Sequence, residues 1–160
     1  MRASILLLGP LLARFKEVDL AFPGGCVLGK RSVHAHLHAL TKLGAEIIES
    51  DESIHLKATT LQPANIIMAE ASVTATENAI MAAVLIPGLT TIRWVAMEPH
   101  VQDLCHFLKK MGASIEGIGS PMLTIQGGQP LAGCDYTVTA DYLEAGTLVL
   151  AAVLTNGDVR

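Results

Sequence analysis

An internal repeat constrains the fold of this chain more than any other feature of its sequence. The segments "MAAVLIPG" and "LAAVLTNG" end at Gly88 and Gly157, which are 69 residues apart. The segments "LTKLGAEI" and "LKKMGASI" carry Gly44 and Gly112, which are 68 residues apart. Two independent motif pairs at nearly one offset indicate copies of a single supersecondary unit. We therefore expect pseudo-symmetric units of about 69 residues.

Each unit is expected to contain two helices and several short strands. An amphipathic helix ends at Leu-Gly or Met-Gly, two strands follow, and a second helix that ends at glycine precedes a further strand. The apolar spacing predicts the first kind of helix over 99–111, with Gly112 as its C-terminal cap. Alternation predicts strands at "SIHLK" and "MLTIQ", and we also expect strands at "TTIRWV" and "YTVT". Segment 3–22 resembles the end of an earlier unit.

The second helix of each unit is apolar on nearly all sides. The segments "ENAIMAAVLI" and "AGTLVLAAVL" carry few polar residues, so both are expected in the interior. The chain as a whole is 51% hydrophobic and only 16% charged, which agrees with largely hidden helices. The prediction is an α/β fold in which helices pack inside sheets. Cys105 lies on the apolar face of its helix and is expected to be core.

Charge and hydropathy exclude several classes of function. The net charge is −4 and no basic stripe is present, so we expect no nucleic-acid partner. The longest apolar runs fall far short of the roughly 20 residues that a membrane span needs, so we expect no membrane segment.

Cysteine and histidine usage argues against a disulfide scaffold and a metal site. The three cysteines are Cys26, Cys105 and Cys134. An odd number in an apolar chain is typical of a reducing compartment. The alternating histidines are His34, His36 and His38. On a helix they would point to different faces, so ordinary polar positions are favoured over a metal site.

The stretch "PGGCVLGKR", residues 23–31, surrounds Cys26 with glycines and ends in two cations. Glycines let a backbone bend without the steric penalty of a Cβ atom. Nearby cations and a helix start after Arg31 would favour the thiolate of Cys26. A loop with a functional cysteine is one interpretation, and a solvated loop is the other.

Six motifs in order carry a resemblance to a known family. They are "RASILLLGPLLARF", "PGGCVLGKR", "KLGAEI", "SVTATENAIMAAVL", "EPHVQDLCHFLKKMGA" and "ADYLEAGTLVLAAVL". The chain resembles the central part of the UDP-N-acetylglucosamine enolpyruvyl transferases over essentially all of its length. The resemblance implies the inverse α/β architecture, with two lobes of three repeats each. Residues 1–139 would be most of one lobe, and residues 140–160 the truncated start of the second.

The resemblance also implies an activity. The family transfers the enolpyruvyl group of phosphoenolpyruvate to the 3-hydroxyl of UDP-N-acetylglucosamine, releasing phosphate, as the first committed step of peptidoglycan precursor synthesis in the bacterial cytoplasm. It needs no metal and no organic cofactor. The substrates are the only partners implied, and a missing second lobe would complete the cleft.

Site residues follow from matching the family motifs to this sequence. Cys26 matches the loop cysteine that donates a proton and can form an adduct with phosphoenolpyruvate, and Arg31 the arginine that contacts phosphate and nucleotide groups. Arg2 matches an arginine that binds the nucleotide sugar. The two nucleotide-binding segments comprise Ser32, Val33, His34 and Ala35, and Glu70, Ala71, Ser72 and Val73. Ser72 and Thr74 also have a structural interpretation as helix caps, and Glu98 and Glu144 one as solvated surface residues.

Departures from the family pattern fall in the nucleotide-binding segments. The family usually has other residues at Ser32, His34, Glu70, Thr74 and Tyr142. Two rival functions therefore stay open. One is the sister enzyme that acts on shikimate 3-phosphate, which lacks the cysteine loop. The other is a non-catalytic binding module.

Overall fold

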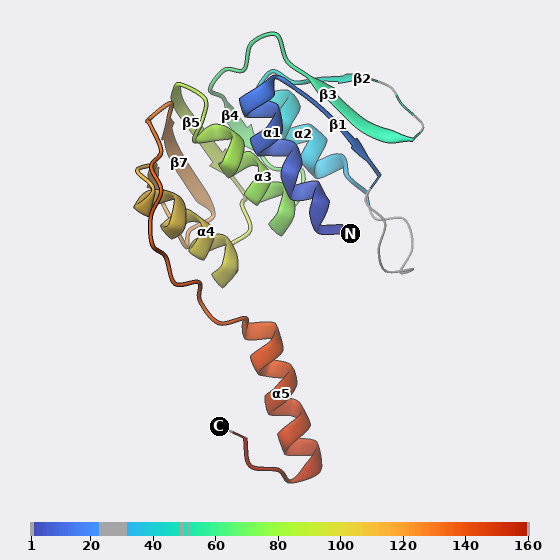
Figure 1. Ribbon diagram of the computed structural model, residues 1–160, viewed down its shortest axis with the longest axis vertical. Coiled ribbons are helices and arrows are strands. Elements are labelled where there is room, and N and C mark those ends of the chain that lie inside the picture. The colour runs from blue at the N-terminus through green and yellow to red at the C-terminus, as the bar shows by residue number, and fades with distance from the viewer. Residues whose placement is uncertain (1, 23–31, 49, 51, 160) are drawn as a thin grey trace.

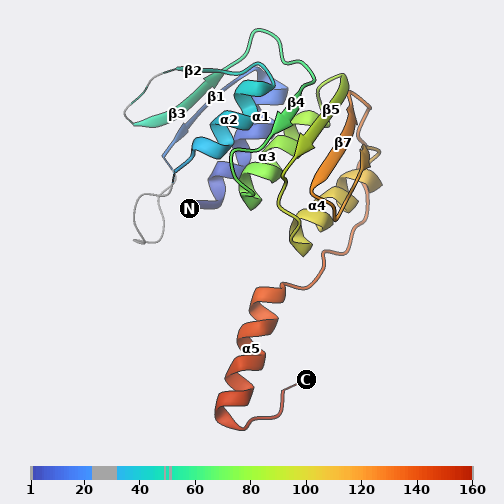
Figure 2. The same ribbon diagram turned by 180° about the vertical axis from the view of Figure 1, so that it is seen from behind.

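The structure is a computed structural model that describes residues 2–22, 32–48, 50 and 52–159. Cys26 and Arg31 lie outside the described residues. The helices are η1 (Arg2–Leu7, a 3₁₀ helix), α1 (Leu8–Phe15), α2 (His34–Lys42), α3 (Val73–Ala83), α4 (Pro99–Lys110) and α5 (Tyr142–Thr155). The strands are β1 (Glu17–Ala21), β2 (Glu46–Ile48), β3 (Ser53–Lys57), β4 (Asn65–Ile67), β5 (Gly88–Arg93), β6 (Ser114–Glu116) and β7 (Met122–Gly127). Figures 1 and 2 show their arrangement from opposite sides.

The predicted repeat is confirmed by the order and pairing of the elements. When the predicted unit is followed from its second helix, the order is helix, strand, helix, strand, strand. This order occurs first as α1-β1-α2-β2-β3 and then as α3-β5-α4-β6-β7. In the first unit β3 lies between β1 and β2, and in the second β7 lies between β5 and β6, all antiparallel. Strand β4 adds to the second sheet by parallel pairing with β5. Related sequences have therefore formed related sheets.

Helix α3 lies at the centre of the molecule. It contacts α1, α2, α4 and β7, and Figure 1 shows it between the two sheets. Its residues from Ala75 to Ile80 are all buried, as the apolar sequence predicted. Ser72 begins the helix by accepting a hydrogen bond from the Ala75 amide at 3.5 Å. The expected arrangement of helices inside sheets is thus confirmed.

Two glycines end the equivalent helices of the two units. Gly44 follows α2 with φ +101°, and Gly112 follows α4 with φ +114°. These left-handed conformations are strained for residues with a Cβ atom, which explains the repeated Leu-Gly and Met-Gly pairs. The predicted C-terminal cap at Gly112 is therefore confirmed.

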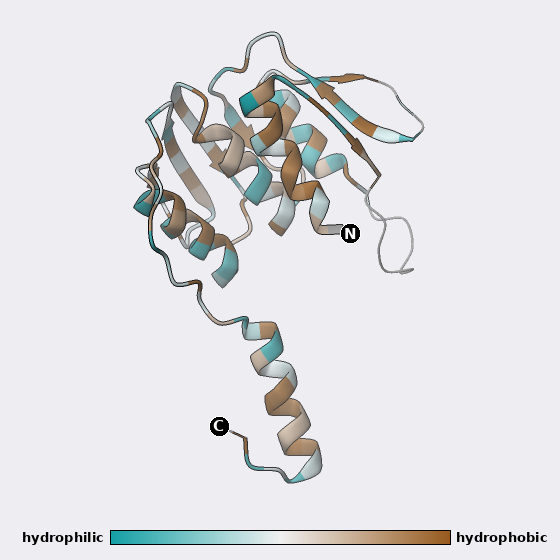
Figure 3. Ribbon diagram, in the orientation of Figure 1, coloured by the Kyte–Doolittle hydropathy of each residue, from teal (hydrophilic) through white to brown (hydrophobic). Residues whose placement is uncertain are grey.

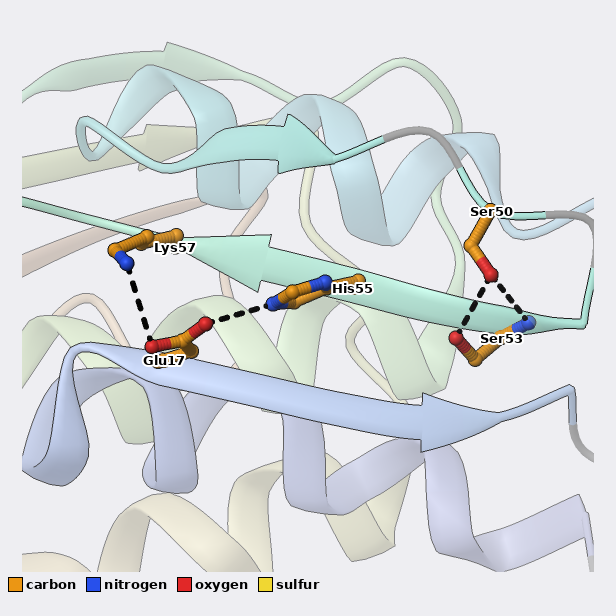
Figure 4. A network of polar contacts seen from close by, with 5 residues as sticks. All are labelled: Glu17, Ser50, Ser53, His55 and Lys57. Atoms are coloured by element: carbon orange, nitrogen blue, oxygen red, sulfur yellow. Dashed lines mark hydrogen bonds and ion pairs between the residues drawn. The ribbon is translucent and has the colours of Figure 1, made fainter.

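A polar network joins the strands of the first sheet (Figure 4). The Glu17 carboxylate of β1 lies 2.9 Å from His55 Nε2 and 3.5 Å from Lys57 Nζ on β3. The hydrogen bond from His55 is the main cause that lowers the pKa of Glu17, and Lys57 adds to it. This exposed network is a cross-strand contact that stabilises the sheet.

Two predicted strands differ from the structure. The segment "YTVT" (136–139) is not a strand, because Tyr136 packs on α4 instead. Its hydroxyl donates to Asp103 Oδ1 at 2.8 Å, and its ring meets Phe107 edge-on at 5.3 Å between centroids. The segment "TTIRWV" (90–95) forms a strand only as far as Arg93, since Trp94 turns out of the sheet with φ +59°. The local sequence pattern predicted neither the contacts of Tyr136 nor the turn at Trp94.

The position of α5 also contradicts a prediction. Its apolar sequence was expected in the interior, but the helix projects away from the remainder of the chain (Figure 1), and none of its residues is buried. Figure 3 colours much of this helix as hydrophobic. Exposed positions include Leu150, Val153 and Leu154. No described residue supplies the cover that α1, α2 and α4 give to the equivalent helix α3.

Candidate functional site

The two predicted nucleotide-binding segments lie at the starts of two adjacent helices. Residues 32–35 lead into α2 and residues 70–73 lead into α3, and these helices contact each other. The sequence places the segments 35 or more residues apart, so packing of the helices brings them together. Arg2 is the first residue of η1, which contacts α1 and α3.

A pocket of about 450 Å³ lies where these helix starts meet η1. The described residues that line it are Ala3, Ile5, Ser32, His36, Glu70, Ser72 and Thr74. The structure therefore brings together three predicted site residues, Ser32, Glu70 and Ser72. Glu70 is exposed and is the only charged residue in this described lining.

The other predicted residues of these segments do not line the pocket. Ala35 is buried and Val73 packs against the core, so both anchor their helices. Val33 lines a separate hollow beside the first sheet. His34 is exposed with its ring 6.0 Å from that of His38, and Ala71 is exposed as well.

Two serine hydroxyls in the pocket accept backbone hydrogen bonds. Ser32 Oγ accepts from the His34 amide at 3.0 Å. Ser72 Oγ accepts from the Ala75 amide at 3.5 Å, so its predicted role as a cap is confirmed. Thr74 is not the cap, since its hydroxyl meets His36 instead. The pocket thus lies at two helix N-termini, where the peptide dipoles favour negative charge or acceptor oxygens.

A hydrogen-bond network that the sequence did not reveal extends from the pocket lining into the core. His36 is 4% exposed. Its Nε2 lies 3.1 Å from Thr74 Oγ1, and its Nδ1 lies 2.9 Å from Asn78 Nδ2. Asn78 is fully buried and contacts the backbone of Ile5 and Gly9. The prediction of three ordinary polar histidines is therefore wrong for His36.

One signal in the sequence could have found this network. Asn78 is an amide within an otherwise apolar helix, and a buried amide needs partners for its donors and its acceptor. That requirement predicts polar groups on the neighbouring helices, although it does not say which ones.

Glu98 does not fit the solvated surface residue that we expected. Its Oε2 atom is buried and has no hydrogen-bond partner among the described residues. Burial raises the pKa of the neighbouring Glu77, and smaller effects come from His100, which lowers it, and Glu98, which raises it. Glu144 is exposed, in agreement with the expected solvation.

The structure describes two cysteines, Cys105 and Cys134. Cys105 is 1% exposed, so its predicted core position is confirmed. Burial, with a contribution from Glu77, raises the pKa of its thiol to about 11. The thiol therefore stays protonated and unreactive at neutral pH. Cys134 is half-buried and lies in the segment between β7 and α5.

Two further classes of feature are not found in the described part of the chain. Residues 2–22, 32–48, 50 and 52–159 contain no group of three histidine, cysteine or acidic side chains that could hold a metal ion. None of the described helices combines the length and the hydropathy needed to cross a membrane.

Comparisons with known proteins agree with this architecture. The chain is 52% identical over 160 residues to a UDP-N-acetylglucosamine 1-carboxyvinyltransferase of Borrelia garinii subsp. bavariensis, covering 100% of this chain and 38% of that protein. It is 50% identical over 157 residues to the protein of that name from Treponema pallidum, covering 98% and 37%. The chain thus spans little more than a third of the curated relatives it matches.

Solved structures show the same fold at lower identity. The enolpyruvyl transferase NikO from Streptomyces tendae aligns with a TM-score of 0.78 and 24% identity, over 95% of this chain and 36% of that one. An EPSP synthase from Acinetobacter baumannii aligns with a TM-score of 0.70 and 22% identity, over 93% and 34%. The family described as EPSP synthase (3-phosphoshikimate 1-carboxyvinyltransferase) matches residues 1–160. With the repeated α/β units and the whole length in agreement, this chain belongs to the EPSP synthase family.

Proposed function

We propose that this chain is part of an enzyme that transfers the enolpyruvyl group of phosphoenolpyruvate to the 3-hydroxyl of UDP-N-acetylglucosamine. The observation that carries the proposal is the convergence of segments 32–35 and 70–73 on one pocket. Relatives about 50% identical over the chain carry the name of this activity. Those names favour this substrate over shikimate 3-phosphate, and the setting would be the bacterial cytoplasm.

The pocket is proposed to bind the nucleotide sugar. Ser32, Glu70 and Ser72 would contact it directly, and Ala35 and Val73 would anchor the two helix starts. Val33, His34 and Ala71 complete the two proposed substrate-binding segments. Arg2 and Arg31 adjoin the lining residues Ala3 and Ser32 in the sequence. We propose that these arginines supply the positive charge that a diphosphate requires, since arginine binds phosphate through paired hydrogen bonds.

Cys26 is proposed as the proton donor of the reaction. The vinyl carbon of phosphoenolpyruvate takes a proton while the sugar hydroxyl adds to the neighbouring carbon. Phosphate then leaves, and the added proton is lost as the double bond reforms. A positioned acid or base is typically worth about 10²–10⁴-fold in the rate of such a step.

The division into lobes is part of this proposal. Residues 1–139 would form most of one lobe and residues 140–160 the beginning of the second. Support comes from α5, whose apolar surface is uncovered, and from the coverage of only 38% of a relative. The cleft would then need residues beyond this chain, so the chain alone should bind the nucleotide but not turn it over.

Mass spectrometry tests the proposal on the chain as it is. After exposure to fosfomycin, an epoxide that alkylates the family's cysteine, we expect modification confined to Cys26, and a Cys26→Ser variant should stay unmodified. A parallel phosphate-release assay with both substrates should show no turnover. Equal labelling of Cys105 and Cys134 would contradict the role of Cys26, and robust phosphate release would contradict the need for a second lobe.

A further inference from the structure

The orientation of the Asn78 amide is fixed by two backbone groups. Asn78 Oδ1 lies 2.7 Å from the Gly9 amide nitrogen, which can only donate. Asn78 Nδ2 lies 2.8 Å from the Ile5 carbonyl oxygen, which can only accept. The two ends of the amide therefore cannot be exchanged without losing both bonds. One hydrogen of Nδ2 remains for another acceptor.

That remaining hydrogen determines the tautomer of His36. Asn78 Nδ2 lies 2.9 Å from His36 Nδ1. Because Nδ2 can only donate, Nδ1 has to accept, and the ring proton lies on Nε2. His36 Nε2 then donates to Thr74 Oγ1 across 3.1 Å. Asn78 of α3 thus donates a hydrogen bond to His36 of α2, and His36 donates one to Thr74 of α3.

The Thr74 hydroxyl is left with its own hydrogen to donate. Its oxygen accepts from His36, and no described residue takes the hydroxyl hydrogen. Thr74 lines the pocket beside Ser32 and Ser72, whose oxygens also accept from protein amides. Among the described residues, each of the three hydroxyls therefore keeps a hydrogen that it can donate toward the pocket. As donors, these three hydroxyls suit a ligand group that only accepts hydrogen bonds, whereas the Glu70 carboxylate in the same lining does not.

We propose that Asn78 is a positioning residue that acts through His36 to hold the Thr74 hydroxyl as a donor toward an acceptor oxygen of the ligand. The proposal rests on the pocket being the nucleotide-sugar site. The acceptor oxygen belongs either to the diphosphate or to a carbonyl of the uracil ring, and both sources have the same chemistry. Neither His36 nor Asn78 needs to touch the ligand.

The first test reads the tautomer without any ligand. Nitrogen-15 NMR of the histidine ring in the 160-residue chain should show a proton on Nε2 and none on Nδ1 of His36. In Asn78→Asp the carboxylate cannot donate, so the proton should move to Nδ1. Far-UV circular dichroism and the fluorescence of Trp94 establish that the variant is folded. A proton on Nδ1 in the wild-type chain would overturn the proposal, whatever the pocket binds.

The second test measures binding of UDP by calorimetry. Thr74→Val, which keeps the shape but removes the hydroxyl, should weaken binding about tenfold, the loss expected for one hydrogen bond. Thr74→Ser should restore most of the affinity. Repeating the titrations with uridine and with inorganic diphosphate identifies the acceptor, since only the probe that contains it should lose affinity in Thr74→Val.

Coupling between the variants separates positioning from a merely structural role. Asn78→Asp should weaken UDP binding in the wild-type background but have no further effect when Thr74 is already valine. An equal loss in both backgrounds, or normal UDP binding by Thr74→Val, would refute the proposed role. If the wild-type chain bound no UDP while His36 carried its proton on Nε2, the function proposed for the pocket would fail and the tautomer relay would stand.

Discussion

Replacing Gly9 with alanine should destabilise the chain although alanine is the better helix former. Gly9 lies on α1 where it meets α3. A Cβ atom at this position would overlap the backbone oxygen of Asn78 and lie 2.9 Å from Asn78 Oδ1. A backbone atom of the central helix cannot yield as a flexible side chain does, so α1 has to move away from α3.

Three terms decide the size of the effect. Overpacking of a core contact costs about 1–3 kcal/mol. Loss of the 2.7 Å hydrogen bond from Gly9 to Asn78 costs a further 0.5–1.5 kcal/mol or so. The higher helix propensity of alanine returns about 1 kcal/mol. The net loss should be about 0.5–3.5 kcal/mol, and the middle of that range corresponds to several degrees in the melting temperature of a chain of this size.

A matched control is available in the same chain. Gly146 lies within α5, and a Cβ atom there would have nothing within 4 Å. Urea unfolding followed through Trp94, the single tryptophan, should show a lower midpoint for Gly9→Ala. The midpoint for Gly146→Ala should be unchanged or slightly higher, because only helix propensity changes there. An unchanged or higher midpoint for Gly9→Ala would refute the close contact between α1 and α3.

Two further predictions concern titratable groups in the core. Because burial raises the pKa of Glu77 above its ordinary value of 4.5, its contribution to stability is full below that pH and is lost as the pH rises through the pKa in the folded state. Glu77→Gln should therefore be more stable than wild type at pH 7, with the difference shrinking toward pH 4 in urea melts. A difference independent of pH would contradict this. Cys105, with a pKa of about 11, should resist iodoacetamide at pH 8 until urea unfolds the chain, whereas Cys134 should react earlier. Equal rates in peptide mass spectra would argue against the burial of Cys105.

Features with a local cause could be predicted from the sequence. Gly44 and Gly112 end their helices because a left-handed residue is needed there, and the alternation in 53–57 reflects two faces of one strand. Contacts between residues distant in the sequence could not be predicted from local patterns. The strand expected at 136–139 is wrong because Asp103 and Phe107 of α4 hold Tyr136.

The same distinction between local patterns and distant contacts applies to the candidate site. Its segments 32–35 and 70–73 could be named from their resemblance to family motifs, and the pocket contains Ser32, Glu70 and Ser72. The buried residues His36 and Asn78 could not be named in this way, because an alternating run of histidines does not show which ring turns toward the core. The proximity of Asn78 on α3 decides that for His36.

The sequence by itself determined the repeat, the C-terminal ends of α2 and α4, strands β3 and β7 and the family, because each depends on near neighbours or on a pattern copied along the chain. Only the tertiary structure decided that α3 is enclosed while the similarly apolar α5 is bare, and that His36, Thr74 and Asn78 form one buried network. Burial and hydrogen bonding depend on which surfaces meet in space. No local pattern predicts a contact between residues that lie 38 and 42 positions apart in the sequence.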